Sequence, residues 1–224
     1  TTGTELRDPG TPLEPGQIYE SNGWMLEALL RGEAAEVTRL GIVADERDDH
    51  RALLERALEA DVVVTSGGVS VGPHDLVREA LHALGVEEIF WGIAMRPGKP
   101  LSFGRRGPKL VFGLPGNPVA SLVGGLLLVA PAVRRLQGAE SAAAVPLPAR
   151  LAVEIRRNAA RDDLLRGTLG RDGDALVFAP GDGQESHMIV RAASASAIGR
   201  IPRGDGVLAA GTVVDAYPLS RPGA

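Results

Sequence analysis

The sequence has no cysteine among its 224 residues, which excludes disulfide bonds and metal sites built from thiolates. Histidine is also scarce. The chain has four histidines, and no two of them have the spacing of a helical zinc site. No histidine is spaced with a nucleophilic side chain either, so we predict no catalytic triad.

An excess of positive charge and a long apolar run are missing as well. The 24 basic residues are outnumbered by 28 acidic ones, and a net charge of -4 argues against nucleic acid as the partner. The longest apolar stretch, residues 119–133, is shorter than the roughly 18 residues of a membrane span and contains Pro131, so it predicts a buried helix. No secretory signal or transit peptide opens the sequence, which favours a cytoplasmic protein.

Residues 61–75, DVVVTSGGVSVGPHD, carry the strongest pattern in the chain. A β-branched apolar run predicts a buried strand, and it breaks at Thr65 into a loop with three glycines. Glycines let backbone amides come close to an anion, and helical spacing begins at Leu76, so the pattern indicates a phosphate-type site. Glycines after a strand can also simply turn the chain, and this stretch alone leaves both interpretations open.

Two further loops follow apolar extended runs. MRPGKP at 95–100 comes after VEEIFWGIA, and GLPGNPVAS at 113–121 comes after KLVFGL. Open α/β sheets bind ligands at the carboxyl ends of their strands, so we expect all three loops to leave the same edge of one sheet.

The loop MRPGKP is not a nucleotide-binding P-loop, because its glycine spacing is wrong and Pro100 stands where a magnesium-binding Ser or Thr is required. It places Arg96 and Lys99 on either side of a stiff Pro-Gly corner. Two such cations suit an oxyanion or a pterin phosphate. A solvated surface pair is the alternative.

Three acidic residues, Glu5, Asp45 and Asp75, are expected where strands lead into loops. Carboxylates opposite a bound phosphate are the usual ligands of magnesium, because this cation prefers oxygen. Asp45 and Asp75 could equally cap helices.

The order of predicted elements favours an α/β protein with a mostly parallel, three-layer sheet, followed by a small all-β, barrel-like domain. Residues 138–148 read as a linker, so we expect domains at 1–138 and 146–224. The expected helices are 21–31, 50–60, 76–85 and 118–136, the last with Asn117 as N-cap and Pro118 as its first residue. The expected strands of the first domain are 36–43, 61–65, 86–94 and 109–113.

Several of these stretches resemble the molybdopterin molybdenumtransferases, the family of MoeA and of the E domain of gephyrin. The matching stretches are TGTEL at 2–6, SNGWML at 21–26, TSGGVSVGPHD at 65–75, MRPGKPLSFG at 95–104, LPGNPVAS at 114–121 and, more weakly, QESHMIVRAASASAIGRIPRG at 184–204. The resemblance covers nearly the whole chain and implies a molybdopterin-binding-like α/β fold.

The resemblance implies a homodimeric enzyme of molybdenum cofactor biosynthesis that uses Mg²⁺. It would insert molybdenum from molybdate into adenylylated molybdopterin and release AMP. Glu5, Asp45 and Asp75 carry over as catalytic and metal-binding residues, although the family usually has Asp where this chain has Thr4. The ligand-binding residues that carry over are Thr65, Ser66, Gly67, Gly68, Ser70, Gly72, Arg96, Pro97, Gly98, Lys99, Pro100, Pro115, Gly116, Asn117, Pro118, Ser121 and, in the last domain, Ser186, with Arg161 and Arg166 nearby.

Two alternatives remain. Molybdopterin adenylyltransferases share the α/β fold, but those that stand alone lack a C-terminal β domain. The chain could also be a non-catalytic binding or scaffold module. In the resembling family a strand leads into the first motif and further domains help to build the site, so we expect a C-terminal part that turns over poorly alone.

Overall fold

The computed structural model describes residues 1–43, 47–68, 76–185, 187 and 189–219. The chain divides into two compact units. The first comprises Thr1–Ile93 and Pro100–Ala142, and the second comprises Ala94–Lys99 and Ala143–Ala224. Each unit is described by itself.

The first unit is built on a four-stranded sheet in the order β3-β7-β6-β4. Its strands are β3 (Val62–Ser66), β4 (Glu87–Trp91), β6 (Ser102–Arg106) and β7 (Lys109–Leu114). β3 and β7 are parallel, whereas β6 is antiparallel to both of its neighbours. The α/β class is confirmed, but this sheet is mixed rather than mostly parallel. The missed strand β6 explains the difference, because Gly107 turns the chain directly from β6 into β7 as a hairpin.

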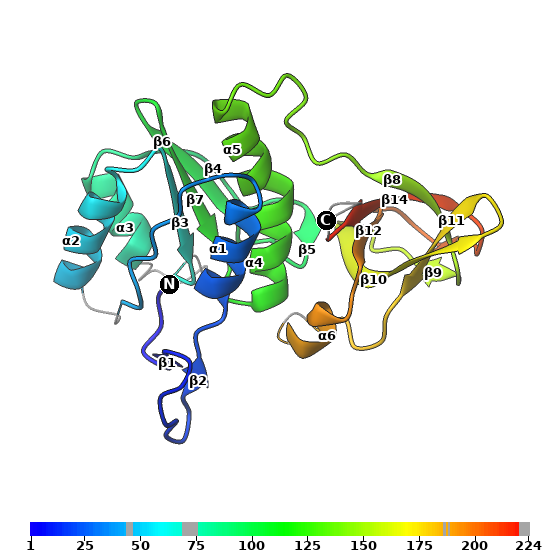
Figure 1. Ribbon diagram of the computed structural model, residues 1–224, viewed down its shortest axis with the longest axis horizontal. Coiled ribbons are helices and arrows are strands. Elements are labelled where there is room, and N and C mark those ends of the chain that lie inside the picture. The colour runs from blue at the N-terminus through cyan, green and yellow to red at the C-terminus, as the bar shows by residue number, and fades with distance from the viewer. Residues whose placement is uncertain (44–46, 69–75, 186, 188, 220–224) are drawn as a thin grey trace. The chain divides into compact units, whose positions relative to one another are not determined.

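Helices cover both faces of this sheet (Figure 1). α2 (Arg47–Ala57) and α3 (Leu76–Ala83) lie on one face, and α1 (Asn22–Arg31) lies on the other with the long helix 118–136. The long helix consists of α4 (Pro118–Gly124), a π-helical turn η1 (Gly125–Val129) and α5 (Ala130–Leu136).

The long helix is apolar enough to cross a membrane by composition, but in this unit it is a core helix. Its residues Val123, Val129 and Ala130 are fully buried, and the same core contains Leu101 of the sheet region and Leu114 of β7. The expectation of a buried helix at this position is therefore confirmed.

The strand predicted at 36–43 does not form. Only its end, at Val43, is bridged to residues 1–3. Thr1 N donates to Gly41 O at 3.1 Å, and Val43 N donates to Thr1 O at 3.0 Å. Gly3 N donates to Val43 O at 3.3 Å. On their other side these three residues meet β3, where Thr2 N donates to Ser66 O at 3.0 Å. The segment is bridged only at Val43, so the prediction is wrong for most of its length.

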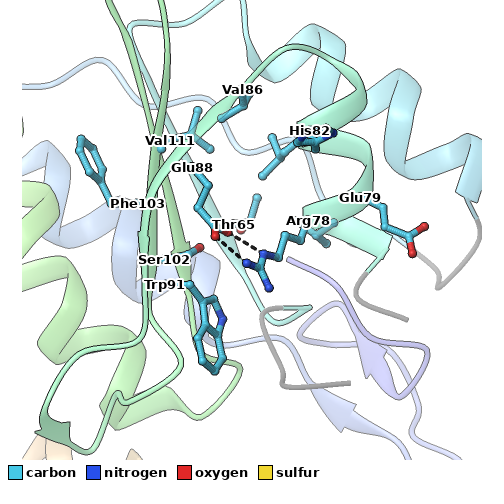
Figure 2. Close-up of a pocket in the computed structure, with 13 residues that line it drawn as sticks. Thr65, Arg78, Glu79, His82, Val86, Glu88, Trp91, Ser102, Phe103 and Val111 are labelled. Atoms are coloured by element: carbon cyan, nitrogen blue, oxygen red, sulfur yellow. Dashed lines mark hydrogen bonds and ion pairs between the residues drawn. The ribbon is translucent and has the colours of Figure 1, made fainter. Parts of the chain in front are cut away.

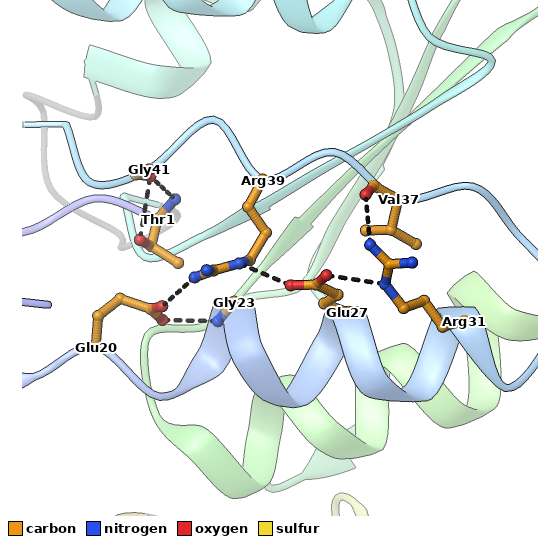
Figure 3. Close-up of polar contacts among 8 residues, drawn as sticks. All are labelled: Thr1, Glu20, Gly23, Glu27, Arg31, Val37, Arg39 and Gly41. Atoms are coloured by element: carbon orange, nitrogen blue, oxygen red, sulfur yellow. Dashed lines mark hydrogen bonds and ion pairs between the residues drawn. The ribbon is translucent and has the colours of Figure 1, made fainter. Parts of the chain in front are cut away.

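Side chains hold the unpaired segment in place instead (Figure 3). The Arg39 guanidinium lies 2.7 Å from the carboxylate of Glu27 on α1 and 3.4 Å above the ring of Trp24. Glu20 caps the first turn of α1, because its carboxylate accepts a hydrogen bond of 2.6 Å from Gly23 N. Ser21, the N-cap residue, makes no side-chain capping bond.

Before α1 the chain makes a small parallel pair, β1 (Leu6–Arg7) and β2 (Ile18–Tyr19).

The second unit is a closed barrel, as the sequence predicted. Strands β10 (Asp162–Asp172), β11 (Ala175–Pro180), β8 (Leu147–Leu151), β14 (Val213–Pro218) and β12 (Ala197–Ile201) pair in a ring that returns to β10. The side chain of Phe178 fills the interior of the barrel, and a side chain at Gly199 would collide with the aromatic ring of Phe178. The barrel also carries β5 (Met95–Arg96), α6 (Ile189–Ala193) and the pair β9 (Ile155–Arg156) and β13 (Val207–Leu208).

We propose that the two units are separate domains, with the boundary in the region 138–148. Residues 137–146 form no helix or strand. Limited proteolysis should therefore cut first within this segment and leave a stable α/β core. A first cut within β7 or at the start of α4, found by mass spectrometry of the early fragments, would contradict the proposal.

Candidate ligand site

Three stretches that are far apart in the sequence meet in a buried polar cluster of Asn22, Ser66 and Ser121. The Asn22 side-chain amide donates to Ser66 Oγ at 2.9 Å and to the carbonyl of Gly116 at 2.8 Å. Ser66 Oγ lies 3.2 Å from Ser121 Oγ and 3.4 Å from the carbonyl of Pro115. Asn22 is 8% exposed, Ser66 3% and Ser121 0%, so water does not compete for these bonds.

The cluster ties the carboxyl ends of β3 and β7 to the start of α1. Gly67 N donates to Leu114 O at 3.0 Å, which joins the two loops directly after their strands. Gly67 and Gly68 have φ values of +89° and +64°, and a side chain at Gly67 would lie 2.6 Å from Thr2 O. Only glycine allows the first motif and the two loops to pack this closely.

These contacts separate positioning residues from residues that a ligand can reach. Ser66 and Ser121 are buried and bonded to each other, so they shape the loops rather than face solvent. Of the other predicted residues, Thr65 and Pro115 are buried and Pro118 is half-buried. Gly68, Gly116 and Asn117 are exposed at the edge.

Sequence reasoning missed Asn22 as a site residue. The stretch SNGWML resembled the family, but no role in the site was predicted for its asparagine. The structure instead places Asn22 as the first residue of α1 with its side chain in the cluster, and its Oδ1 has no partner there. A polar residue that begins an otherwise apolar helix was the available signal.

The start of α4 offers backbone donors at the same edge. Asn117 is the N-cap residue, as predicted, but its side chain makes no capping hydrogen bond, and Pro118 is at N1. The first amides of this long helix are therefore not satisfied by the cap, and the positive end of the helix dipole faces that edge.

The loop 95–100 follows β4, which ends at the same sheet edge as β3 and β7, as expected, but most of the loop then joins the second unit. β4 runs in the same direction as β3 and β7, so the chain leaves that edge. β5 then pairs in parallel with β10, because Ala94 O accepts from Asp162 N at 3.0 Å. Residues 94–99, including Pro97 and Gly98, are thus part of the second unit, and only Pro100 returns to the first.

The two cations of this loop have different surroundings. Arg96 is 53% exposed at its side chain and pairs with Asp163 of β10, whose side chain is 3% exposed, at 2.7 Å. Lys99 is exposed, and the described residues provide it with no ion-pair partner. Arg96 is therefore an oriented cation, with one edge on a buried carboxylate and the rest open to a ligand.

A second ion pair lies on the other side of the same strand. Burial favours the neutral form of Asp162, but hydrogen bonds from Arg203 N and the Arg200 guanidinium outweigh it and lower the pKa of that carboxyl. Because adjacent residues of a strand point to opposite sides, Asp162 binds Arg200 while Asp163 binds Arg96.

The arginines noted in the last domain also differ from each other. Arg166 is buried and donates to the carbonyls of Gly183 and Glu185, so it holds the segment after β11. Arg161 is half-buried. Ser186 lies outside the described residues.

Of the three predicted metal ligands, the structure describes only Glu5. Glu5 is exposed, and its carboxylate folds back over Gly3, where a Cβ would lie 2.7 Å from Glu5 Oε2. Asp45 and Asp75 lie outside the described residues, as do Ser70 and Gly72. Within the part of the chain that is described, no three acidic or histidine side chains form a group suited to a metal ion.

Family comparisons agree with this arrangement. Residues 1–135 match the family described as a probable molybdopterin binding domain, and residues 148–219 match the MoeA C-terminal region, domain IV. The chain belongs to the MoeA family of molybdopterin molybdenumtransferases. The resemblance inferred from the motifs is confirmed.

Named relatives of this MoeA-family chain are molybdopterin molybdenumtransferases. Molybdopterin molybdenumtransferase 2 of Mycobacterium tuberculosis is 34% identical over 98% of the chain and 55% of its own length. The Haemophilus influenzae molybdopterin molybdenumtransferase is 43% identical over 62% of the chain and 34% of its own length. A molybdopterin biosynthesis MoeA protein of Pyrococcus horikoshii has the same fold, with a TM-score of 0.81, 32% identity, and coverage of 98% of the chain and 53% of that structure.

The MoeA-family chain is matched over nearly its whole length by the Mycobacterium tuberculosis and Pyrococcus horikoshii proteins, but spans only about half the length of each. These relatives are about twice as long as the chain, so the activity of the whole enzyme is a proposal.

Proposed function

We propose that this protein inserts molybdenum from molybdate into adenylylated molybdopterin and releases AMP. The observation that carries the proposal is the cluster of Asn22, Ser66 and Ser121, which fixes two glycine-containing loops at one sheet edge. Backbone amides held in this way, beside an uncapped helix start, suit the phosphates of such a substrate. In the second unit, Arg96 and Lys99 are cations suited to molybdate.

Three groups of predicted residues have proposed roles. The amides near Gly67 and Gly68 and the start of α4 would bind phosphate, and Arg96 and Lys99, with Ser186, would bind molybdate. Glu5, Asp45 and Asp75 would hold Mg²⁺. The exposed carboxylate of Glu5 is the hard oxygen donor that this cation prefers, so the described member of the set fits the metal. Bound there, Mg²⁺ would neutralise phosphate charge.

The chain's own groups act by position and electrostatics. The two loops hold the phosphates of the substrate in one place, and Arg96 presents a cation whose direction is set by Asp163. Fixed donors and charges of this kind stabilise the charge that develops when the phosphoanhydride breaks.

The deciding experiment follows AMP release by the full-length protein supplied with adenylylated molybdopterin and molybdate. AMP release that depends on molybdate supports the proposal, and its absence with properly folded protein contradicts it. The 224-residue chain alone should release AMP poorly, because we propose that the site is completed in a homodimer of the longer protein. Sedimentation of the full-length protein tests the homodimer separately.

Molybdopterin adenylyltransferase is the less favoured activity, because the second unit is a barrel that matches the MoeA C-terminal region. In the same assay that enzyme would form adenylylated molybdopterin from ATP rather than consume it. A scaffold protein would bind the ligand and do neither.

Asp163→Asn tests whether Asp163 directs Arg96. The substitution removes the charge that holds the guanidinium, so the full-length enzyme should need about tenfold more molybdate for half-maximal AMP release, with little change in kcat. Arg105→Gln breaks a comparable but exposed pair with Glu87, at 2.9 Å, and serves as the matched control. If Asp163→Asn lowers only the melting temperature, its bond to Arg96 serves the barrel alone.

A further inference from the structure

We propose that a cavity between α3 and the sheet of the first unit binds a flat, uncharged heteroaromatic ring. The cavity measures about 480 Å³, within the range of small-molecule sites. It lies on the α3 side of the sheet, whereas Asn22 and Ser121 of the buried cluster belong to helices on the opposite side. Thr65 is the one lining residue that the sequence analysis also named as ligand-binding, and none of the roles proposed above uses the cavity.

The walls of the cavity are mainly apolar. Helix α3 contributes Val77 and Leu81. Val86 and Val111 line the cavity from the sheet, whereas the ring of Phe103 points to the other face (Figure 2). Trp91, at the end of β4, presents an indole ring at one end of the cavity, on which a planar ligand could stack. Such walls favour an aromatic ring over a flexible polar ligand.

Two charged side chains of the cavity, Arg78 and Glu88, are matched to each other. Arg78 donates to both oxygens of Glu88, through Nε at 2.6 Å and Nη2 at 2.5 Å. The same guanidinium lies 5.8 Å from the ring centroid of Trp91. A charged ligand would have to break this fork or remain unpaired among apolar walls, which is costly, so the site favours an uncharged ligand.

Two wall residues carry hydrogen-bonding groups that have no partner among the described residues. Thr65 is more than nine-tenths buried, and its Oγ1 has no hydrogen-bond partner. Trp91 Nε1 is buried and unpartnered too, and Figure 2 shows this nitrogen on the ring edge turned toward Arg78. Unpaired buried donors cost free energy, so a ligand that supplies partners would bind with a gain.

Together these features define the ligand class. The ring should carry an acceptor for the indole N–H and an adjacent N–H or acceptor for the threonine hydroxyl, as a bicyclic lactam does. Such a ring could belong to a free small molecule or, on the proposed function, to the pterin of the substrate itself.

Quinazolin-4-one, a neutral bicyclic lactam, is a suitable probe. The chain has two tryptophans, Trp24 and Trp91. In the full-length protein, Trp24 and any tryptophan outside these 224 residues are replaced by Phe. Trp91 is then the only tryptophan that reports binding. We expect saturable quenching of its emission and a matching calorimetric isotherm. Trp91→Phe keeps a ring but removes the N–H, and Thr65→Val removes the hydroxyl at nearly constant volume. By calorimetry each should weaken binding about five- to tenfold.

Absence of saturable binding would overturn the proposal, and so would binding that neither substitution weakens. Competition in the AMP-release assay then distinguishes the two sources. Competitive inhibition assigns the cavity to the substrate ring, and binding without competition assigns it to a separate ligand. The titration needs no turnover, so its result stands whether or not the proposed reaction is observed.

Discussion

Replacing Asn22 with aspartate should lower the free energy of unfolding by about 3 kcal/mol and remove most AMP release in the full-length protein. The substitution keeps the shape of the side chain but replaces its donor with a carboxylate oxygen. That oxygen would face the carbonyl of Gly116, now 2.8 Å from the amide, in a place that is 8% exposed. The buried charge and the lost hydrogen bond between the two loops both lower the free energy of unfolding.

Asn117→Asp is the matched control for this change. Asn117 is exposed and makes no side-chain capping bond, so its unfolding free energy should stay within about 0.5 kcal/mol of the parent. Urea unfolding of both variants, followed by circular dichroism, measures the difference. Equal stability of the two variants would show that the cluster does not hold the loops together.

Asp75→Asn should reduce AMP release by on the order of a hundredfold and leave ligand binding largely intact. Asp75 follows the glycine-rich stretch in the sequence and precedes α3, so its carboxylate could hold magnesium or cap a helix. Capping needs only a side-chain oxygen, which asparagine retains, whereas magnesium requires the charge.

The variant should therefore melt within a few degrees of the parent and accumulate uncleaved adenylylated ligand, measured by chromatography of quenched reactions. Hydrolysis at the parental rate would identify Asp75 as a structural cap. It would also remove the basis for a magnesium site made of Glu5, Asp45 and Asp75.

Local patterns predicted those parts of the fold that local interactions determine. The β-branched run of β3, the glycines at 67 and 68 and the Asn-Pro start of α4 each have a short-range cause, and the structure has these elements where they were expected. The change from helix–strand alternation to short strands likewise predicted the barrel.

Other features depend on partners far away in the sequence. Asn22 meets Gly116 across 94 positions, and Arg96 meets Asp163 across 67, so no local pattern could reveal either contact. The same reason moved the loop 95–100 to the barrel, since its pairing with β10 is a long-range contact. The segment 36–43 has the composition of a strand, but a strand forms only where a neighbour pairs with it along its length.

The contact of residues 1–3 with β3 bears on the register of that strand. Alternate residues of a parallel strand direct their backbone groups to opposite sides. Asp61 and Gly67 bond to β7, so Ser66 faces the other way and accepts from Thr2 N at 3.0 Å. A slip of β3 by one residue would therefore break both contacts and displace the first motif together with the loop after β7.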